Sequence, residues 1–216
     1  MAKLVTIDDA ANMVKDGMTI MVGGFMGCGS PHRIIDKLVE RGVKDLTLIC
    51  NDAGFPDYGV GKMVMQKQFK KIYASHIGLN PNAGKQMNEG ETEIILVPQG
   101  TLAERIRCAG AGLGGVLTPT GVGTIVQEGK KVINVDGKDY LLELPLRADI
   151  AIIEAYRSDR MGNLQYRGST RNFGEIMATA ADTVIAEVRE VVDVGEISPD
   201  HVHTPGIFID YITGGN

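Results

Sequence analysis

The sequence has few cysteines, no excess of basic residues and no long apolar run. Its three cysteines, Cys28, Cys50 and Cys108, lie far apart and form no Cys-x-x-Cys pair. This argues against a disulfide framework and a zinc site, and favours a reducing compartment. The net charge of −5 offers no basic field for nucleic acid or a membrane surface. No run reaches membrane-spanning length, and no signal-peptide core is visible. We therefore expect a cytoplasmic protein with no nucleic-acid or membrane partner.

Glycine, in contrast, is abundant, with 28 residues among 216. The glycines cluster in loops after predicted strands rather than in a low-complexity tract, which indicates binding surfaces built from backbone. The chain shows no internal repeat and no change of composition that would mark a linker. Its length suits one α/β domain with a sizeable core, so we expect a single domain over residues 1–216.

Predicted strands and helices alternate along the chain. Short apolar runs with β-branched members predict buried strands. Thr6 and a Thr101–Glu104 capping box predict helix starts, whereas Asn80–Gly84 is typical of a plain turn. The predicted strands are 19–22, 45–50, 69–75, 93–97, 149–154, 183–187 and 207–212. This alternation is typical of a mainly parallel sheet with helices on both faces, and we predict a three-layer α/β/α fold.

A hairpin interrupts this alternation in the second half of the chain. Lys131–Leu142 alternates apolar and polar residues around Asp136-Gly137, a dipeptide typical of type I′ turns. Two-residue turns join antiparallel strands, so we expect a small antiparallel flap beside the parallel sheet. The glycine-rich stretch Ala109–Gly123 precedes it, and irregular stretches of that length are usually functional.

The stretch 16–31 combines a buried strand, a glycine loop and a helix start. Ser30 is predicted to be the N-cap and Pro31 the first helical residue. Free N–H groups and the positive dipole end at such a start suit a phosphate, a carboxylate or an anionic transition state. The glycine spacing matches neither the dinucleotide fingerprint nor the P-loop. Spacing alone therefore leaves both a ligand loop and a tight structural turn open.

Four side chains are candidates for chemical roles. Asn51 and Gln99 each follow a predicted strand, so we expect both at the sheet edge that carries the glycine loop. Both can donate hydrogen bonds to a carboxylate or an oxyanion, although residue type alone favours ordinary turn chemistry. Cys28 precedes a helix and could be a lowered-pKa nucleophile, but no base is identifiable, so we favour a small side chain in a tight loop. His32 is predicted to be a solvated surface residue, and no metal site is expected.

The residues from Asp16 to Pro31 resemble the signature of family I coenzyme A transferases at every signature position. The pattern is Asp-Gly, two residues, three apolar residues, Gly-Gly-Phe, three residues and Gly-x-Pro. Asn51–Gly54 and Pro98–Arg107 resemble motifs of the α half of these enzymes. Thr118–Gly121 and Arg171–Phe173 are also similar to family strings, so the resemblance extends over essentially the whole chain.

The resemblance implies an α subunit that works with a β subunit in an α₂β₂ heterotetramer. Coenzyme A would be a co-substrate, with no tightly bound cofactor, and would move between a short-chain acyl-CoA and a carboxylate by a ping-pong route. Gln99 would contribute to the oxyanion hole, and Asn51 would face the substrate carboxylate. The coenzyme A or acyl region would contact Gly23, Gly24, Phe25, Met26, Gly27, Cys28 and Gly29. The family's nucleophilic glutamate lies in a Ser-Glu-Asn-Gly string of the β half, which this sequence lacks. The chain alone should therefore be catalytically incomplete.

A shorter stretch indicates which substrate branch of the family the chain resembles. Ser75–Gly84 is more similar to the acetate–acetoacetate branch, which includes acetate/butyrate–acetoacetate enzymes, than to the 3-oxoadipate or succinyl 3-oxoacid branches. Two different classes also stay open: a sugar-phosphate isomerase-like enzyme, which shares the general fold, and a non-catalytic anion-binding module.

Overall fold

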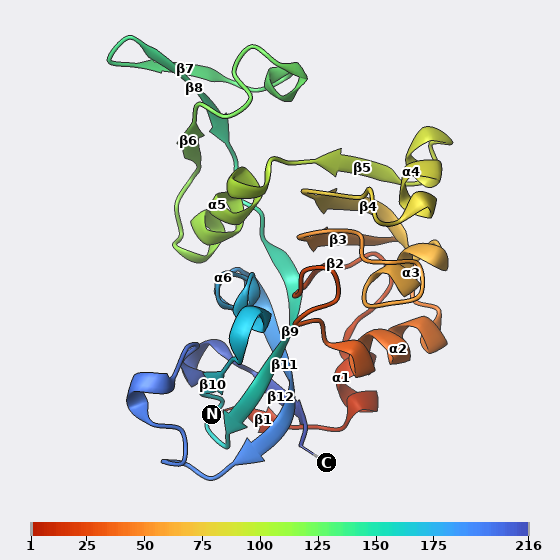
Figure 1. The fold of residues 1–216 in the computed structure, drawn as a ribbon, viewed down its shortest axis with the longest axis vertical. Helices are drawn as coiled ribbons and strands as arrows, with labels where there is room; N and C mark the ends of the chain where they lie inside the picture. Colours follow the sequence, from red (N-terminus) through yellow and green to blue (C-terminus); the bar gives the residue numbers. More distant parts are fainter. Residues whose placement is uncertain (1, 216) are drawn as a thin grey trace.

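A large, mainly parallel sheet forms the centre of the molecule in the computed structural model, which describes residues 2–215 (Figure 1). All neighbours in the main order of this sheet are parallel, and β10 (Leu164–Gln165) alone pairs antiparallel, with β9. The strand order is β1 (Lys3–Leu4), β12 (Tyr211–Gly214), β11 (Ala181–Val192), β9 (Ala148–Asp159), β2 (Thr19–Val22), β3 (Leu46–Cys50), β4 (Phe69–Ala74) and β5 (Glu93–Leu96).

Helices cover both faces of this sheet, which confirms the predicted three layers. One face carries α1 (Ile7–Met13), α2 (His32–Arg41), α3 (Gly61–Met65) and α4 (Pro81–Asn88), and the other carries α5 (Gln99–Gly110) and α6 (Gly174–Ala178). Within β2, Ile20 and Val22 enter the first core while Met21 enters the second. Burial on both faces explains why the strands are continuous apolar runs rather than alternating patterns.

The strand order reverses direction at β2. From β2 the chain proceeds through β3, β4 and β5 to one edge, with its crossover helices on one face. The later strands β9, β11 and β12 build the other half, with α6 on the opposite face. Open α/β sheets bind ligands beyond the strand ends at such a switch point. The loop that leaves β2 is therefore placed where a ligand crevice is expected.

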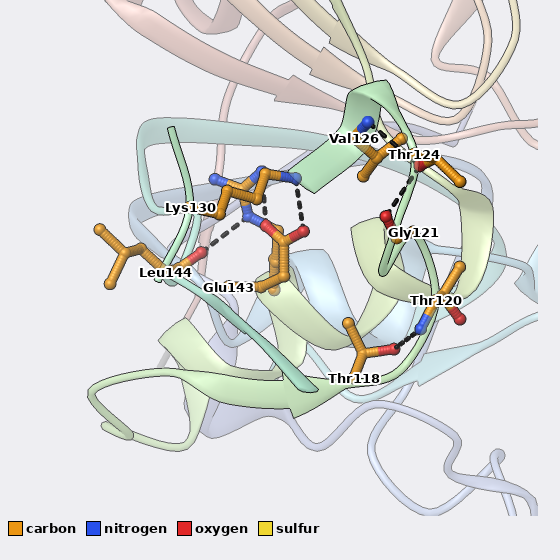
Figure 2. A network of polar contacts seen from close by, with 9 residues as sticks. Thr118, Thr120, Gly121, Thr124, Val126, Lys130, Glu143 and Leu144 are labelled. Carbon is orange, nitrogen blue, oxygen red and sulfur yellow. Dashed lines mark hydrogen bonds and ion pairs between the residues drawn. The ribbon is translucent and has the colours of Figure 1, made fainter. Parts of the chain in front are cut away.

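The predicted flap is present as a separate three-stranded antiparallel sheet. Its order is β6 (Val116–Thr118), β8 (Lys138–Glu143) and β7 (Val132–Val135), and it projects from the body at the upper left of Figure 1. Asp136 and Gly137 have φ of 51° and 79°, as a type I′ turn requires. Local hydrogen bonds shape the glycine-rich approach, such as the one from Thr124 Oγ1 to the Gly121 carbonyl at 2.8 Å (Figure 2).

One predicted turn and one predicted helix cap are wrong. Asn80–Gly84 is not a plain turn: Asn80 caps α4 by accepting from Asn82 N at 3.2 Å, and Pro81 is its first residue. Asn followed by Pro begins helices as readily as it makes turns. Thr101 does not cap α5, because that helix already begins at Gln99 and the Thr101 hydroxyl has no hydrogen-bond partner within residues 2–215.

Three boundaries also shift near the ends of elements. The first helix ends at Met13 rather than at Gly17, and α6 is shorter than the predicted 173–181 because residue 181 already belongs to β11. The predicted strand 207–212 is shifted to Tyr211–Gly214, since Gly206–Phe208 forms a 3₁₀ turn. No helix within residues 2–215 combines the length and apolarity needed to cross a membrane.

Candidate active site

The loop after β2 is a closed, hairpin-like turn. Phe25 and Cys28 exchange both backbone hydrogen bonds, at 3.0 and 2.9 Å. Met26 and Gly27 between them have φ of 52° and 79°, the combination found in type I′ turns. Phe25 and Met26 are each 40% exposed. The turn therefore holds an aromatic and a thioether side chain out from the sheet edge.

Two side chains from outside the turn, Asp52 after β3 and His32 in α2, hold it in place. Asp52, buried after β3, accepts from Met26 N at 2.8 Å and from Gly54 N at 2.8 Å. His32 Nε2 donates to the Gly27 carbonyl at 3.0 Å, and its ring lies 4.4 Å from that of Tyr58. The prediction that His32 is a solvated surface residue is therefore wrong. Its position in the first turn of α2 brings it back over the glycine loop.

The start of α2 also differs from the prediction. The helix begins at His32, Pro31 occupies the cap position without a side-chain cap, and Ser30 Oγ donates instead to the Gly23 carbonyl at 3.2 Å. The cap comes from β11, because the Glu187 carboxylate accepts from Ile34 N at 2.9 Å and Arg33 N at 3.2 Å.

Glu187 changes what the helix start can bind. Burial raises the pKa of Glu187, while the two backbone N–H groups act to lower it. The backbone N–H groups of Arg33 and Ile34, which the sequence suggested for an external anion, already donate to the Glu187 carboxylate. An anionic ligand must find its donors elsewhere on the sheet edge.

A segment far along the chain forms the other wall of the site. Asn172 Nδ2 donates to the Cys28 carbonyl and to the Ser169 carbonyl, both at 3.0 Å. Gly29 has φ of 78°, and a Cβ there would lie 2.5 Å from the Thr170 carbonyl oxygen. The contact between Gly29 and Thr170 therefore requires glycine. Sequence reasoning included Asp52 and Asn172 in motif-like strings but did not predict their contacts with the loop, because nothing local in the sequence marks those contacts.

A cavity of about 330 Å³ lies between the loop and this segment. Asn51, Gln99 and Cys28 all line it, as the shared sheet edge predicts. None of the lining side chains is charged. The lining consists of Phe25, Cys28, Asn51, Gln99, Ser169, Asn172 and Phe173.

The remaining loop residues line different spaces. Met26, Gly27 and Gly29 line, with Cys28, a second cavity of about 550 Å³ that Glu154 and Glu187 also reach. Gly23 and Gly24 lie behind the turn at a void of about 10 Å³. Of the seven predicted loop residues, five therefore line one or both of the larger cavities, and Gly23 and Gly24 lie behind the turn.

The carboxamides in the 330 Å³ cavity differ in what they can offer. Ser75 Oγ donates to the Asn51 backbone carbonyl at 2.7 Å and shares this hydrogen with Asn51 Oδ1 at 3.1 Å, and the Asn51 NH₂ group is the donor left for a ligand. Gln99 is exposed and is the first residue of α5, whose N-terminus has no side-chain cap. Uncapped N–H groups and the positive dipole end favour negative charge. The cavity can therefore bind a carboxylate or an oxyanion.

The same walls contain no general base and no carboxylate nucleophile. Glu154 and Glu187 lie near the loop, but Arg189 Nε donates to Glu154 at 3.1 Å and Glu187 caps α2. Residues 2–215 contain no group of three or more His, Cys, Asp or Glu side chains that could hold a metal. His203 accepts from Tyr166 N at 2.9 Å, and burial lowers its pKa. The geometry of the described residues thus supplies hydrogen-bond donors and shape.

A family model described as coenzyme A transferase matches residues 4–215. The chain belongs to this family. This match confirms the family that the signature predicted.

Curated relatives of this coenzyme A transferase chain match it over nearly its full length. It is 56% identical over 210 residues to the alpha subunit of the acetate CoA-transferase of Escherichia coli (strain K12), covering 97% of this chain and 96% of that protein. It is 48% identical over 211 residues to the acetoacetyl-CoA:acetate/butyrate CoA transferase alpha subunit of Clostridium acetobutylicum, covering 98% and 97%. It is 46% identical over 216 residues to a subunit of the succinyl-CoA:3-ketoacid coenzyme A transferase of Helicobacter pylori (strain J99), covering 100% and 93%.

A solved structure shares the fold of this coenzyme A transferase chain. The acyl-CoA transferase of Escherichia coli O157:H7 in a thioester complex with coenzyme A superposes with a TM-score of 0.89 at 22% identity. The match covers 99% of this chain but 47% of that one, so the present chain spans about half the length of that enzyme.

Proposed function

We propose that this chain is the α subunit of a coenzyme A transferase that exchanges coenzyme A between a short-chain acyl-CoA and acetate, butyrate or acetoacetate. The single observation that carries the mechanism is the meeting of Asn51 and Gln99 in one small cavity beside Phe25 and Cys28. The 56% and 48% identities to alpha subunits named for acetate and acetate/butyrate support the branch.

The attacking glutamate comes from a β subunit in this proposal. Its carboxylate oxygen attacks the thioester carbonyl of acyl-CoA, and the carbonyl oxygen becomes an oxyanion. Coenzyme A leaves as a thiolate and yields a mixed anhydride. The thiolate then attacks the glutamyl carbonyl, releases the first carboxylate and leaves a glutamyl–CoA thioester, which the second carboxylate consumes by the reverse steps. This chain supplies donors that stabilise the oxyanion, which fits the absence of a free carboxylate among the cavity residues.

The absence of charged side chains in the 330 Å³ cavity also bears on which carboxylic acid accepts coenzyme A. Relatives named for succinyl-CoA and for 3-oxoadipate are 46–48% identical, so identity alone does not separate the branches. A dicarboxylic acid would bury a second carboxylate against Phe25, Phe173 and neutral polar groups, and an unpaired buried charge is costly. We therefore expect acetate, butyrate and acetoacetate to be better acceptors than succinate.

Gln99→Ala in the assembled enzyme tests the oxyanion role. Loss of one preorganised donor typically reduces turnover by about a hundredfold or more, and we expect this fall in kcat with unchanged assembly. Gln66→Ala, at an exposed position after α3, is the matched control. Equal turnover in Gln99→Ala and wild type would remove the Gln99 side chain from the mechanism.

Division of labour between the two chains can be tested directly. The enzyme is incubated with acyl-CoA, and intact-mass analysis locates the covalently bound coenzyme A. We expect the thioester on the companion chain, and no transfer by the present chain when it is purified alone. A coenzyme A adduct on this chain, or full activity without a companion, would contradict the proposal.

A further inference from the structure

Glu187 joins the two halves of the sheet across the switch point. It lies on β11, in the half built by β9, β11 and β12, whereas α2 follows β2 and belongs to the other half. Its Oε2 accepts from Ile34 N at 2.9 Å and its Oε1 accepts from Arg33 N at 3.2 Å. Glu187 and Ile34 are 153 positions apart in the sequence. The start of α2 is therefore held by a distant strand.

The local alternative to this cap is already used. Ser30, the polar side chain that precedes α2, donates its hydroxyl to the Gly23 carbonyl at 3.2 Å, and the cap position has no side-chain hydrogen bond. Glu187 is 7% exposed, and Arg189, two positions along β11, forms its ion pair with Glu154 instead. A buried carboxylate needs hydrogen bonds to offset the loss of water. Both oxygens of Glu187 obtain them from the backbone of α2.

The first residue of α2 connects this cap to the glycine turn. His32 directly precedes the two residues that Glu187 holds, and its Nε2 donates to the Gly27 carbonyl at 3.0 Å. Gly27 lies in the turn that Phe25 and Cys28 close with their two backbone hydrogen bonds. Both closing residues line the 330 Å³ cavity. A shift of the start of α2 would therefore move one wall of the candidate active site.

We propose that Glu187 is a positioning residue for the reaction: through the start of α2 and His32 it sets where the glycine turn lies relative to Gln99. This inference rests on the proposed function, because the effect on rate depends on the oxyanion donors that the turn faces. Misplacing catalytic groups by about 1 Å can cost roughly a hundredfold in rate. Asp52 and Asn172 hold the same loop through separate hydrogen bonds, so loss of Glu187 alone should cost less than this.

The test is a double-mutant cycle on the assembled enzyme. Glu187→Ala removes the cap, and His32→Phe removes the hydrogen bond to Gly27 while it keeps an aromatic ring beside Tyr58. We expect each variant to lower kcat about tenfold and to leave KM for acyl-CoA within about twofold, because the lost alignment matters in the transition state. The double variant should lose no more than the larger single loss, because both changes break the same connection.

A chemical probe measures the turn itself without relying on activity. Cys28 is exposed, whereas Cys50 and Cys108 are buried, so the rate at which iodoacetamide alkylates the native enzyme reports on the turn. We expect this rate to rise severalfold in Glu187→Ala, since a turn released from α2 opens more often. If Glu187→Ala does not assemble, Glu187→Gln, which keeps one acceptor oxygen, should raise the rate in the same direction.

Glu190→Ala is the matched control, because Glu190 also lies on β11 but forms its ion pair with Arg157 of β9. It should keep the wild-type kcat and the wild-type rate of Cys28 alkylation. An unchanged kcat in Glu187→Ala would overturn the proposal even if the variant were less stable, and so would an unchanged alkylation rate.

Independent losses would also overturn it. If the fold losses in kcat of Glu187→Ala and His32→Phe multiplied in the double variant, the two residues would not act through one connection. Wild-type enzyme that transferred no coenzyme A would instead contradict the proposed function, and the alkylation rates would still decide whether Glu187 positions the turn.

Discussion

The side chain of Asn172 donates a hydrogen bond to the backbone carbonyl of Cys28 over 3.0 Å, although 144 positions separate the two residues. The same Nδ2 atom donates to the Ser169 carbonyl, and Asn172 Oδ1 accepts from Phe173 N at 2.6 Å. One carboxamide thus joins the glycine loop to the segment that forms the opposite wall of the 330 Å³ cavity. This side chain therefore helps to fix the two walls relative to each other.

Asn172→Ala should therefore impair the assembled enzyme without unfolding it. Misplacing catalytic groups by about 1 Å can cost roughly a hundredfold in rate, and we expect a fall in kcat/KM of about ten- to a hundredfold. Steady-state kinetics and circular dichroism check the result. Asn134→Ala is the control, because Asn134 makes comparable hydrogen bonds to Asp139 and Gly137 on the flap. Equal losses in the two variants would refute a specific role for Asn172.

The contact between Gly29 and Thr170 makes a second prediction. Gly29→Ala adds a Cβ that would lie 2.5 Å from the Thr170 carbonyl oxygen at a φ of 78°. The left-handed conformation costs about 1–2 kcal/mol, and overpacking costs about 1–3 kcal/mol more. Urea unfolding should show a loss of at least about 2 kcal/mol.

Gly17→Ala separates these two costs. Gly17 has a φ of 81° but no atom within 4 Å of the added Cβ, so this variant should lose only the conformational part, about 1–2 kcal/mol. A loss in Gly29→Ala no larger than that in Gly17→Ala would show that Thr170 yields to the new methyl group.

Cys28 should be dispensable for the chemistry. It lines the cavity and is exposed, with its Sγ 3.4 Å from Ser169 Oγ, whereas Cys50 and Cys108 are buried. Cys28→Ala should keep activity within about threefold of wild type, because the thiol's hydrogen-bond partner is a serine hydroxyl and no base among residues 2–215 is hydrogen-bonded to it. Iodoacetamide should inactivate wild type by filling the cavity and leave Cys28→Ala active. A hundredfold loss in Cys28→Ala would assign the thiol a chemical step.

Glu187 gives the chain a pH-dependent contribution to stability. Burial raises the pKa of this carboxyl above its ordinary value of 4.5, so the folded chain retains the proton at pH values where the unfolded chain has lost it. Stability from this group is therefore full below pH 4.5 and declines as the pH rises through the folded-state pKa. Urea unfolding of wild type and Glu187→Gln at several pH values isolates the effect. The free energy of unfolding of wild type, relative to the variant, should fall with rising pH, and a constant or rising difference would contradict this origin.

The sequence by itself determined most of the sheet and the family. Thr19–Val22 is a strand with the predicted bounds, and Asp136-Gly137 forms the predicted type I′ turn. These features depend on apolar runs and backbone conformation, which neighbours in the sequence decide. Asn51 and Gln99 also lie at the sheet edge that carries the glycine loop, as predicted, and the structure shows that both line one cavity there.

The tertiary structure decided which residues hold the glycine loop in place and which residue caps the helix that follows it. Ser30 and Thr101 look like caps in the sequence, yet the buried Glu187 caps α2 from β11 and α5 starts at Gln99. His32 turns back to Gly27, and Asn172 reaches Cys28. Such partners are chosen by which side chain the fold brings within about 3 Å of a free backbone group. A local pattern shows that a polar group needs a partner, but packing between distant segments selects which residue it is.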